Sequence, residues 1–194
     1  MIKIGPPHST TDGKAWDDAG RDKIVQIFIE LREQGIISLQ FLYAENRNLV
    51  SSDKHGGDRI SAPKFDVVSV QRINFPISWP NLPFFWFKII VYTKQVTLNC
   101  PSVYITGING SYGRSFLSYW QDLIFSITFI TNNRTNGPFG GRGNSSVFQY
   151  QLGPDRSFGG FHGRARDHLN AIGLYVKQST TLSNVPVTVK NEAV

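Results

Sequence analysis

The sequence predicts an all-β protein, and three observations support this fold class. Glycine and proline are frequent, with 18 and 10 residues among 194, whereas charged residues make up only 18% of the chain. Aromatic residues make up 13%, and aromatic side chains are common in strands. Three similar stretches recur along the chain, each with the two-residue alternation of a strand. Together these features favour many strands joined by turns.

The three similar stretches predict the organisation of the chain. They are Ile37–Tyr43, Phe125–Thr131 and Asn170–Val176, and a small or hydroxyl-bearing residue stands near the start of each. Internal repetition of this kind predicts sheets that share one core and cover one another's edges. A generic β-sandwich is the alternative at this point, because likeness over seven residues does not exclude it.

Further strands and loops follow from the same reading. Ile24–Ile29 alternates upstream of the first stretch and Val103–Gly107 upstream of the second, so each predicts a neighbouring strand. Glycine-rich turns separate the units at His55–Asp58, Asn136–Gly143 and Gly153–Asp155.

Length and charge bound the class of protein. A chain of 194 residues suits one domain with a real core. The net charge is +6, but half of it comes from the segment Val68–Gln95, which holds three basic residues and no acid. Elsewhere basic residues are interspersed with acids, so a mixed solvated surface is favoured over a nucleic-acid-binding face. The single cysteine, Cys100, excludes an internal disulfide framework.

The sequence also bears on location. The N-terminal residues Met1–Pro7 lack the apolar core of a secretion signal. No apolar stretch approaches the roughly 20 residues that span a bilayer. We therefore expect a soluble intracellular protein without a membrane span, cytoplasmic or nucleocytoplasmic.

Motifs of enzymes are missing from the sequence. It contains no P-loop, dinucleotide fingerprint or nucleophile elbow. Its four histidines fall on predicted loops without a cysteine or carboxylate at metal-ligand spacing. The sequence therefore predicts neither an enzyme nor a cofactor or metal.

The C-terminal block Gly160–Val176 resembles the sugar-site segment of the jacalin-related lectins, of the mannose-binding plant type. Other segments similar to the family follow in the family's order: Ile4–Pro6, Ala15–Asp18, Ile36–Phe41, His55–Gly57, Tyr104–Gly107 and Phe129–Gly140. The resemblance implies a β-prism I fold, in which three Greek-key, four-stranded sheets surround a pseudo-threefold axis. It covers residues 3–177, which we expect to form one lectin domain, followed by a C-terminal tail at 178–194.

The resemblance also implies a sugar site made of two loops. In the family, a glycine-rich N-terminal loop offers backbone N–H groups, and the Asp of a Gly-x-x-x-Asp loop accepts hydrogen bonds from sugar hydroxyls. By position the second loop contributes Arg166, Asp167, His168 and Asn170 here. Of the family's N-terminal glycine run, only Gly13 remains.

Two of these positions depart from the family. Asn170 has one acceptor oxygen and an NH₂ donor where the family's Asp only accepts, so charge assistance of about 1–2 kcal/mol is lost. Arg166 replaces a glycine, and it adds strain if this position requires a positive φ. We therefore expect weakened or absent mannose binding.

Two neighbouring motifs give weaker evidence of a binding site. The Asp17–Asp18 pair is expected to be a turn and surface feature, although the family also has it. The stretch His55–Gly57 forms a second loop site in some relatives, but no carboxylate near Gly35 completes such a site here.

The predicted function is therefore a lectin domain that binds mannose- or glucose-type glycans non-covalently, with weakened affinity. The alternative is a jacalin-fold protein that has lost sugar binding and serves as a protein-interaction module, or is a non-functional product. The predicted partners are glycans and not nucleic acid. A homodimer is compatible with the resemblance, because related lectins often dimerise.

The segment Val68–Gln95 interrupts the resemblance. It carries 7 of the 25 aromatic residues, and removing it joins Lys64–Val67 to Val96–Ser102 as one alternating strand. Val68-Ser69 can be encoded by GTA-AGT, a common plant splice donor, and Gln95 by CAG, an acceptor ending. Our hypothesis is a translated intron or gene-model artefact. The alternatives are a loop that touches a membrane or a partner, and a hairpin added to the fold.

This hypothesis predicts what transcripts contain. Reads that join the codon of Val67 directly to the codon of Val96 are expected, because splicing would remove the segment between them. Deep sequencing of transcripts is the measurement. If every read retains the segment, the hypothesis is wrong.

Overall fold

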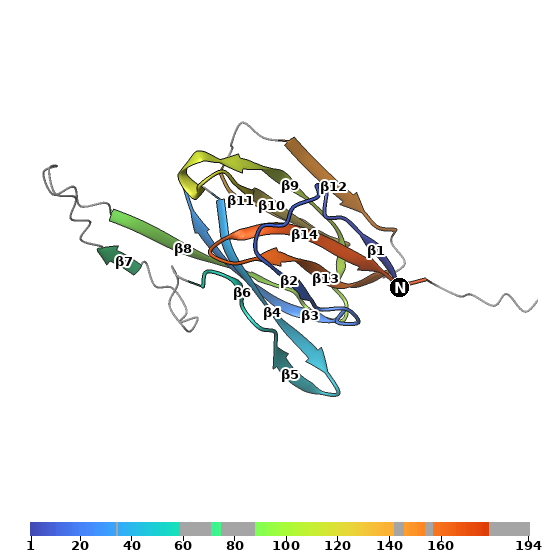
Figure 1. The fold of residues 1–194 in the computed structure, drawn as a ribbon. Helices are drawn as coiled ribbons and strands as arrows, with labels where there is room; N and C mark the ends of the chain where they lie inside the picture. The colour runs from blue at the N-terminus through green and yellow to red at the C-terminus, as the bar shows by residue number, and fades with distance from the viewer. Residues whose placement is uncertain (34, 59–70, 75–87, 142–145, 154–156, 179–194) are drawn as a thin grey trace, which may run out of the picture.

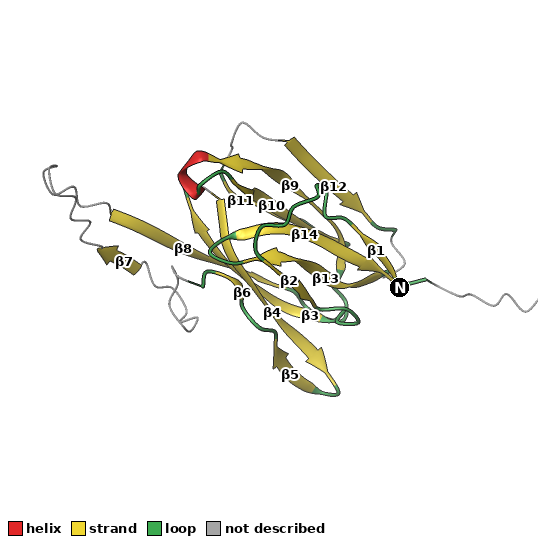
Figure 2. Cartoon of the chain, in the orientation of Figure 1, coloured by secondary structure: helices red, strands yellow, loops and turns green. Residues whose placement is uncertain are grey.

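The computed structural model describes residues 1–33, 35–58, 71–74, 88–141, 146–153 and 157–178 (Figure 1). These residues form fourteen β-strands and one short 3₁₀ helix, η1 (Phe116–Ser118), and no α-helix (Figure 2). No helix among them is long and apolar enough to cross a membrane. The prediction of an all-β protein is confirmed.

The strands pair antiparallel in three sheets. The first sheet has the spatial order β1 (Ile2–Ile4), β14 (Leu169–Val176), β13 (Phe158–Ala165) and β2 (Lys14–Asp17). The second has the order β11 (Thr135–Gly140), β10 (Gln121–Thr131), β9 (Ile105–Ser115) and β12 (Ser146–Gln151). The third has the order β5 (Asn48–Ser51), β4 (Gly35–Glu45), β3 (Ile24–Arg32), β8 (Lys88–Thr97) and β7 (Gln71–Asn74), and β6 (His55–Gly56) also pairs with β4.

All three sheets share one Greek-key plan. A hairpin occupies the centre, a third strand lies outside the second strand of the hairpin, and a fourth lies outside the first. The central hairpins are β3–β4, β9–β10 and β13–β14. In the first sheet the third and fourth positions are taken by β1 and β2, so the two ends of the chain complete one key. The three similar stretches of the sequence are the second hairpin strands β4, β10 and β14.

The third sheet has more than four strands for two reasons. Both β5 and β6 pair with β4, one after the other along its length, and β7 adds an edge beyond β8. Strand β7 and most of β8 belong to the segment 68–95 that interrupts the resemblance. Tyr92 to Gln95 pair in register with β3, from Leu31 to Phe28, so the end of that segment continues the sheet. In Figure 1, β7 and the start of β8 project from the body.

Parts of this region lie outside the described residues. They include the predicted strand at 64–67 and residues 68–70 and 75–87 of the interrupting segment. The origin of the segment stays a prediction. The tail beyond residue 178 also lies outside the described residues.

The core sits where the inner faces of the sheets meet. Phe41 of β4, Phe129 of β10 and Phe161 of β13 are fully buried, one from each sheet. The Phe161 ring centroid lies 5.1 Å from that of Phe41 and 6.0 Å from that of Phe129. Such ring pairs contribute about 0.5–1.5 kcal/mol beyond area burial. Isoleucines and leucines of the central hairpins fill the space around them.

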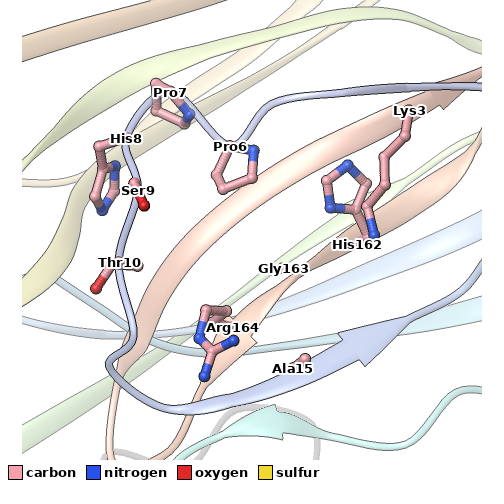
Figure 3. Close-up of a pocket in the computed structure, with 10 residues that line it drawn as sticks. All are labelled: Lys3, Pro6, Pro7, His8, Ser9, Thr10, Ala15, His162, Gly163 and Arg164. Atoms are coloured by element: carbon pink, nitrogen blue, oxygen red, sulfur yellow. The ribbon is translucent and has the colours of Figure 1, made fainter.

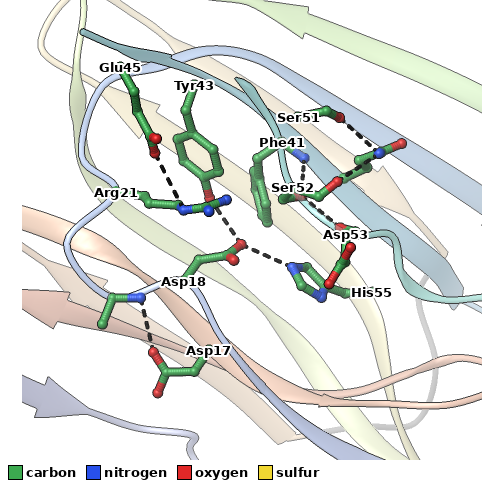
Figure 4. A network of polar contacts seen from close by, with 12 residues as sticks. Asp17, Asp18, Arg21, Phe41, Tyr43, Glu45, Ser51, Ser52, Asp53 and His55 are labelled. Atoms are coloured by element: carbon green, nitrogen blue, oxygen red, sulfur yellow. Dashed lines mark hydrogen bonds and ion pairs between the residues drawn. The ribbon is translucent and has the colours of Figure 1, made fainter. Parts of the chain in front are cut away.

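A buried polar cluster joins the first sheet to the third (Figure 4). Asp18, directly after β2, is 7% exposed, and one carboxylate oxygen accepts a hydrogen bond of 3.1 Å from the Tyr43 hydroxyl. The same oxygen lies 2.9 Å from His55 Nε2. The Trp16 ring stacks on His55 at 3.9 Å. Burial, reinforced by the Asp18 charge, raises the pKa of Tyr43 far above its usual range.

The expectation for the Asp17–Asp18 pair is therefore half wrong. Asp17 is exposed, and its carboxylate caps the following turn by accepting from Ala19 N at 2.9 Å. Asp18 is buried instead, because successive side chains along an extended chain point to opposite faces. His55, which was expected on a loop, is buried as a member of the same cluster.

We predict that Asp18→Ala lowers the free energy of unfolding by about 3 kcal/mol, because it leaves the Tyr43 hydroxyl and the His55 ring buried without their acceptor. Asp17→Ala is the matched control, and it should cost under about 1 kcal/mol because its pairs are exposed. Urea unfolding followed by circular dichroism measures both. Equal losses in the two variants would contradict the assignment of the cluster.

Candidate functional site

The predicted loops meet where the central hairpins turn. The β9–β10 turn carries η1, and the β13–β14 turn carries residues 166–168. The two turns lie at the same end of the body, on the left in Figure 1. The Asn170 side chain bridges them, since its Nδ2 atom donates to the Asp122 carbonyl at 2.8 Å. We call this region the end-loop site.

Asn170 is the most unusual residue of the end-loop site. It is only 1% exposed. Its Nδ2 atom is paired, but its Oδ1 atom is buried and has no hydrogen-bond partner among the described residues. A buried polar atom without a hydrogen-bond partner is rare and calls for an explanation.

Internal symmetry shows that the fold does not require a polar residue there. The sheet register aligns Ala171 with Ser38 and Ser126, because each lies opposite the corresponding position of the first hairpin strand. The residue before each of these is therefore equivalent to Asn170: Ile37 in β4 and Phe125 in β10, both buried. The amide is particular to the β13–β14 key.

Gly13 brings the other predicted loop against Asn170. It lies in the segment 5–13 between β1 and β2, which we call the N-terminal arch. Gly13 has a φ of +72°, and a Cβ on it would lie 2.5 Å from Asn170 Oδ1. Any larger residue would be strained and would clash. The structure thus brings Gly13 and Asn170 together.

Arg166 sits at the exposed rim of the same loop. Its backbone N–H donates to the His168 carbonyl at 3.0 Å, and its carbonyl accepts from Asp58 N at 3.0 Å. Its side chain is exposed. The non-glycine residues with positive φ among the described residues are Asn46, Arg47, Tyr119 and Trp120. Arg166 therefore occupies the former glycine position without left-handed strain.

His168 and Asp167 are less open than the sequence suggested. His168 is 7% exposed, and neither ring nitrogen has a hydrogen-bond partner among the described residues. Burial and the nearby Arg32 charge lower the pKa of His168 to about 4, against an opposing effect of Asp167. Asp167 is half-buried. Predicting all four histidines on loops was wrong, because His162 lies in β13.

Sequence reasoning missed Arg164, which holds the N-terminal arch in place. Its Nε atom donates to the Asp12 carbonyl at 3.0 Å, and its Nη2 atom donates to the carbonyls of Thr11 at 3.0 Å and Gly13 at 2.7 Å. Three consecutive carbonyls thus share one guanidinium. The alternation of β13 would have placed Arg164 on the outer face, but carbonyl acceptors leave no mark in a sequence.

Two further contacts fix the arch. The Asp12 carboxylate accepts a hydrogen bond from Asp122 N at 2.9 Å. The His8 ring stacks on Tyr112 of β9, with centroids 4.4 Å apart and planes inclined by 5°. Burial lowers the pKa of His8, although the Asp122 charge acts in the opposite direction. The arch is therefore tied to both the first and the second sheet.

His168 predicts a pH dependence of stability. Its folded pKa of about 4 lies below the ordinary value of 6.5, so the unfolded chain binds a proton first as the pH falls. Its contribution is complete above pH 6.5 and is lost between pH 6.5 and about 4. His168→Gln should remove up to about 3 kcal/mol of this acid sensitivity. Carboxylates titrate in both proteins, so the difference isolates His168.

Urea unfolding at a series of pH values provides the measurement. The gap between wild type and His168→Gln is expected to be constant above pH 7 and to change in favour of the variant below pH 6.5. A gap that is the same at every pH would show that His168 titrates normally.

Comparison with known proteins agrees with this architecture. The family model for the jacalin-like lectin domain matches residues 6–73 and 87–175. Two Arabidopsis thaliana proteins, Protein RESTRICTED TEV MOVEMENT 1 and Inactive protein RESTRICTED TEV MOVEMENT 1, are each 33% identical, over 95% of this chain and 91% of theirs. A mannose/glucose-specific lectin of Parkia pendula is 41% identical over 46% of this chain and 20% of its own.

Among solved structures, the artocarpin–mannotriose complex superimposes with a TM-score of 0.65 at 25% identity, covering 91% of this chain and 97% of artocarpin. Artocarpin and its relatives are β-prism lectins of the jacalin type. The family model spans most of the chain, and it leaves only residues 74–86 unmatched between its two parts. This protein belongs to the family of jacalin-like lectin domains.

Proposed function

We propose that this protein is a lectin that binds mannose- or glucose-type glycans weakly and non-covalently at the end-loop site. The observation that carries this proposal is Asn170. Its amide is buried where the two equivalent positions are apolar, and its Oδ1 atom lacks a partner. The printed names of relatives support the ligand class, since they include a mannose/glucose-specific lectin and a complex with mannotriose.

The site explains why binding would be weak. The neutral amide accepts a sugar hydroxyl without charge assistance, at a loss of about 1–2 kcal/mol. Gly13 also covers Asn170 Oδ1, so a hydroxyl reaches this atom only if the N-terminal arch moves. That displacement works against the contacts that Arg164 makes with the arch.

Arg166 offers a partial replacement. Its exposed guanidinium has five N–H donors, and no hydrogen bond joins it to another described residue. A sugar hydroxyl at the rim can accept from it. Asp167, half-buried beside it, adds a carboxylate to the same loop. The site would therefore bind a sugar mainly through hydroxyls that accept hydrogen bonds.

A second candidate function is supported by the neighbouring surface. Phe116, Tyr119 and Trp120, at the β9–β10 turn, are 72%, 93% and 64% exposed. Exposed aromatic side chains of this kind are typical of protein-docking surfaces. A protein that has lost sugar binding and contacts a protein at this turn is the alternative, and one of its relatives bears the name Inactive protein RESTRICTED TEV MOVEMENT 1. The homodimer and the cytoplasmic location stay predictions.

Calorimetric titration with a mannotriose tests the proposal. Asn170→Ala is expected to abolish measurable binding, because it removes the Asn170 acceptor and also the hydrogen bond from Nδ2 that joins the two turns of the site. The double variant Arg166→Gly, Asn170→Asp should bind about tenfold more tightly, since it restores the carboxylate and open backbone. Asn48→Ala, an exposed asparagine in β5, is the control and should bind like the wild type.

The outcomes separate the two candidates. Binding that survives Asn170→Ala would place the sugar elsewhere and overturn the proposed site. A wild type that is silent while the double variant binds would favour the candidate that has lost sugar binding.

A further inference from the structure

A hollow lies on the outer face of the first sheet, under the N-terminal arch (Figure 3). Its volume is about 460 Å³, within the usual range of ligand sites. Its lining residues come from β1, the arch, β2 and β13: Lys3, Pro6, Pro7, His8, Ser9, Thr10, Ala15, His162, Gly163 and Arg164. None of them belongs to the loop from Arg166 to Asn170. The hollow is therefore distinct from the end-loop site.

The sheet register explains why the hollow exists. His162 and Arg164 alternate to the outer face of β13, and they stand opposite Gly173 and Ala171 of β14. Because these residues are small, they leave space above this part of the sheet, which forms the floor of the hollow. A Cβ on Gly173 would lie 2.5 Å from the His162 ring. The arch then crosses above this floor, held by Arg164 at one end, and encloses the space.

The lining carries positive charge and no acid. Lys3 pairs with Asp17 at 3.6 Å, but both side chains are about half exposed, so the pairing is weak and the ammonium remains accessible. Arg164 donates hydrogen bonds from Nε and Nη2 to the carbonyls of the arch. Its Nη1 group makes no hydrogen bond to a described residue. Burial, together with the nearby Lys3 charge, lowers the pKa of His162.

The rest of the lining suits a sugar ring. Ser9 and Thr10 supply hydroxyls from the arch. The Thr10 oxygen accepts from Asp12 N at 3.1 Å, which leaves its O–H free to donate. Pro6 and Pro7 supply apolar surface against which a C–H face can pack.

We propose that this hollow binds an acidic sugar, a hexuronic acid residue of a glycan, with its carboxylate between Lys3 and Arg164. Charge-assisted hydrogen bonds from an ammonium and a guanidinium are strong contacts for a carboxylate. The sugar hydroxyls contact Ser9 and Thr10. The proposal goes beyond neutral-sugar binding at the end-loop site and does not depend on it.

Amide chemical shifts in an NMR titration with glucuronic acid test the proposal, with glucose as the neutral comparator. Glucuronic acid is expected to shift the amide of Gly163 in β13, on the floor of the hollow, and glucose is not. The arch amides are left out of this comparison, because a neutral sugar at the end-loop site would also displace the arch. Lys3→Gln should weaken this binding by about fivefold or more, because it removes one of the two cations. Lys14→Gln removes the same charge from an exposed position of β2 outside the hollow, and it should leave binding unchanged.

Three results would overturn the proposal. Equal shifts with glucose would show that the carboxylate is not recognised. Equal weakening of glucuronic acid binding in Lys3→Gln and Lys14→Gln would show that only the net charge of the protein matters. Equal shifts with inorganic sulfate at the same ionic strength would show a general anion site. A titration of Lys3→Gln with mannotriose keeps the two sites separate, since mannotriose is expected to shift Asn170 there as in the wild type.

Discussion

The rest of the structure depends on the buried carboxylate of Asp18. It joins the end of β2 to Tyr43 of β4 and to His55 of β6, so it holds the first sheet against the third. A charge buried to this degree is tolerated only because two donors meet it. The N-terminal arch leads into β2, so the strand that follows the arch is anchored to the third sheet by the same carboxylate.

Both proposed ligand sites are built on the arch, in different ways. At the end-loop site, Gly13 lies against Asn170, whose Nδ2 atom is paired with the Asp122 carbonyl and whose Oδ1 atom is covered. Under the arch, the Lys3 side chain is about half exposed, and the Nη1 group of Arg164 makes no hydrogen bond to a described residue. The position at which the family binds sugar is thus partly covered here, and a positively charged hollow lies beside it. Arg164 contributes to both, because it holds the arch in place against the end-loop site and also lines the hollow.

Much of the fold could be predicted from the sequence because strand alternation is a local signal. The three similar stretches are the second strands of the three central hairpins, and their alternation favoured the all-β class. The three sheets were implied by the resemblance to the jacalin-related lectins, since the stretches alone left a β-sandwich possible. The burial of Asp18 could not be predicted, because nothing in the sequence shows that Tyr43 and His55 meet its carboxylate. The role of Arg164 was hidden for another reason: its partners are backbone carbonyls, which any residue can supply. His168 was placed on an open loop because nothing in the sequence shows that Arg32 lies beside it.

The grip of Arg164 on main-chain atoms has a consequence for variation of the arch. Gly13 must stay glycine and Asp12 also accepts from Asp122 N, but the carbonyl of Thr11 is held by Arg164 whatever side chain this residue carries. Thr11 in particular is anchored only through its backbone. A library randomised at this position would present new chemistry to a glycan on an unchanged scaffold. The protein is in this respect a ready platform for selecting altered recognition.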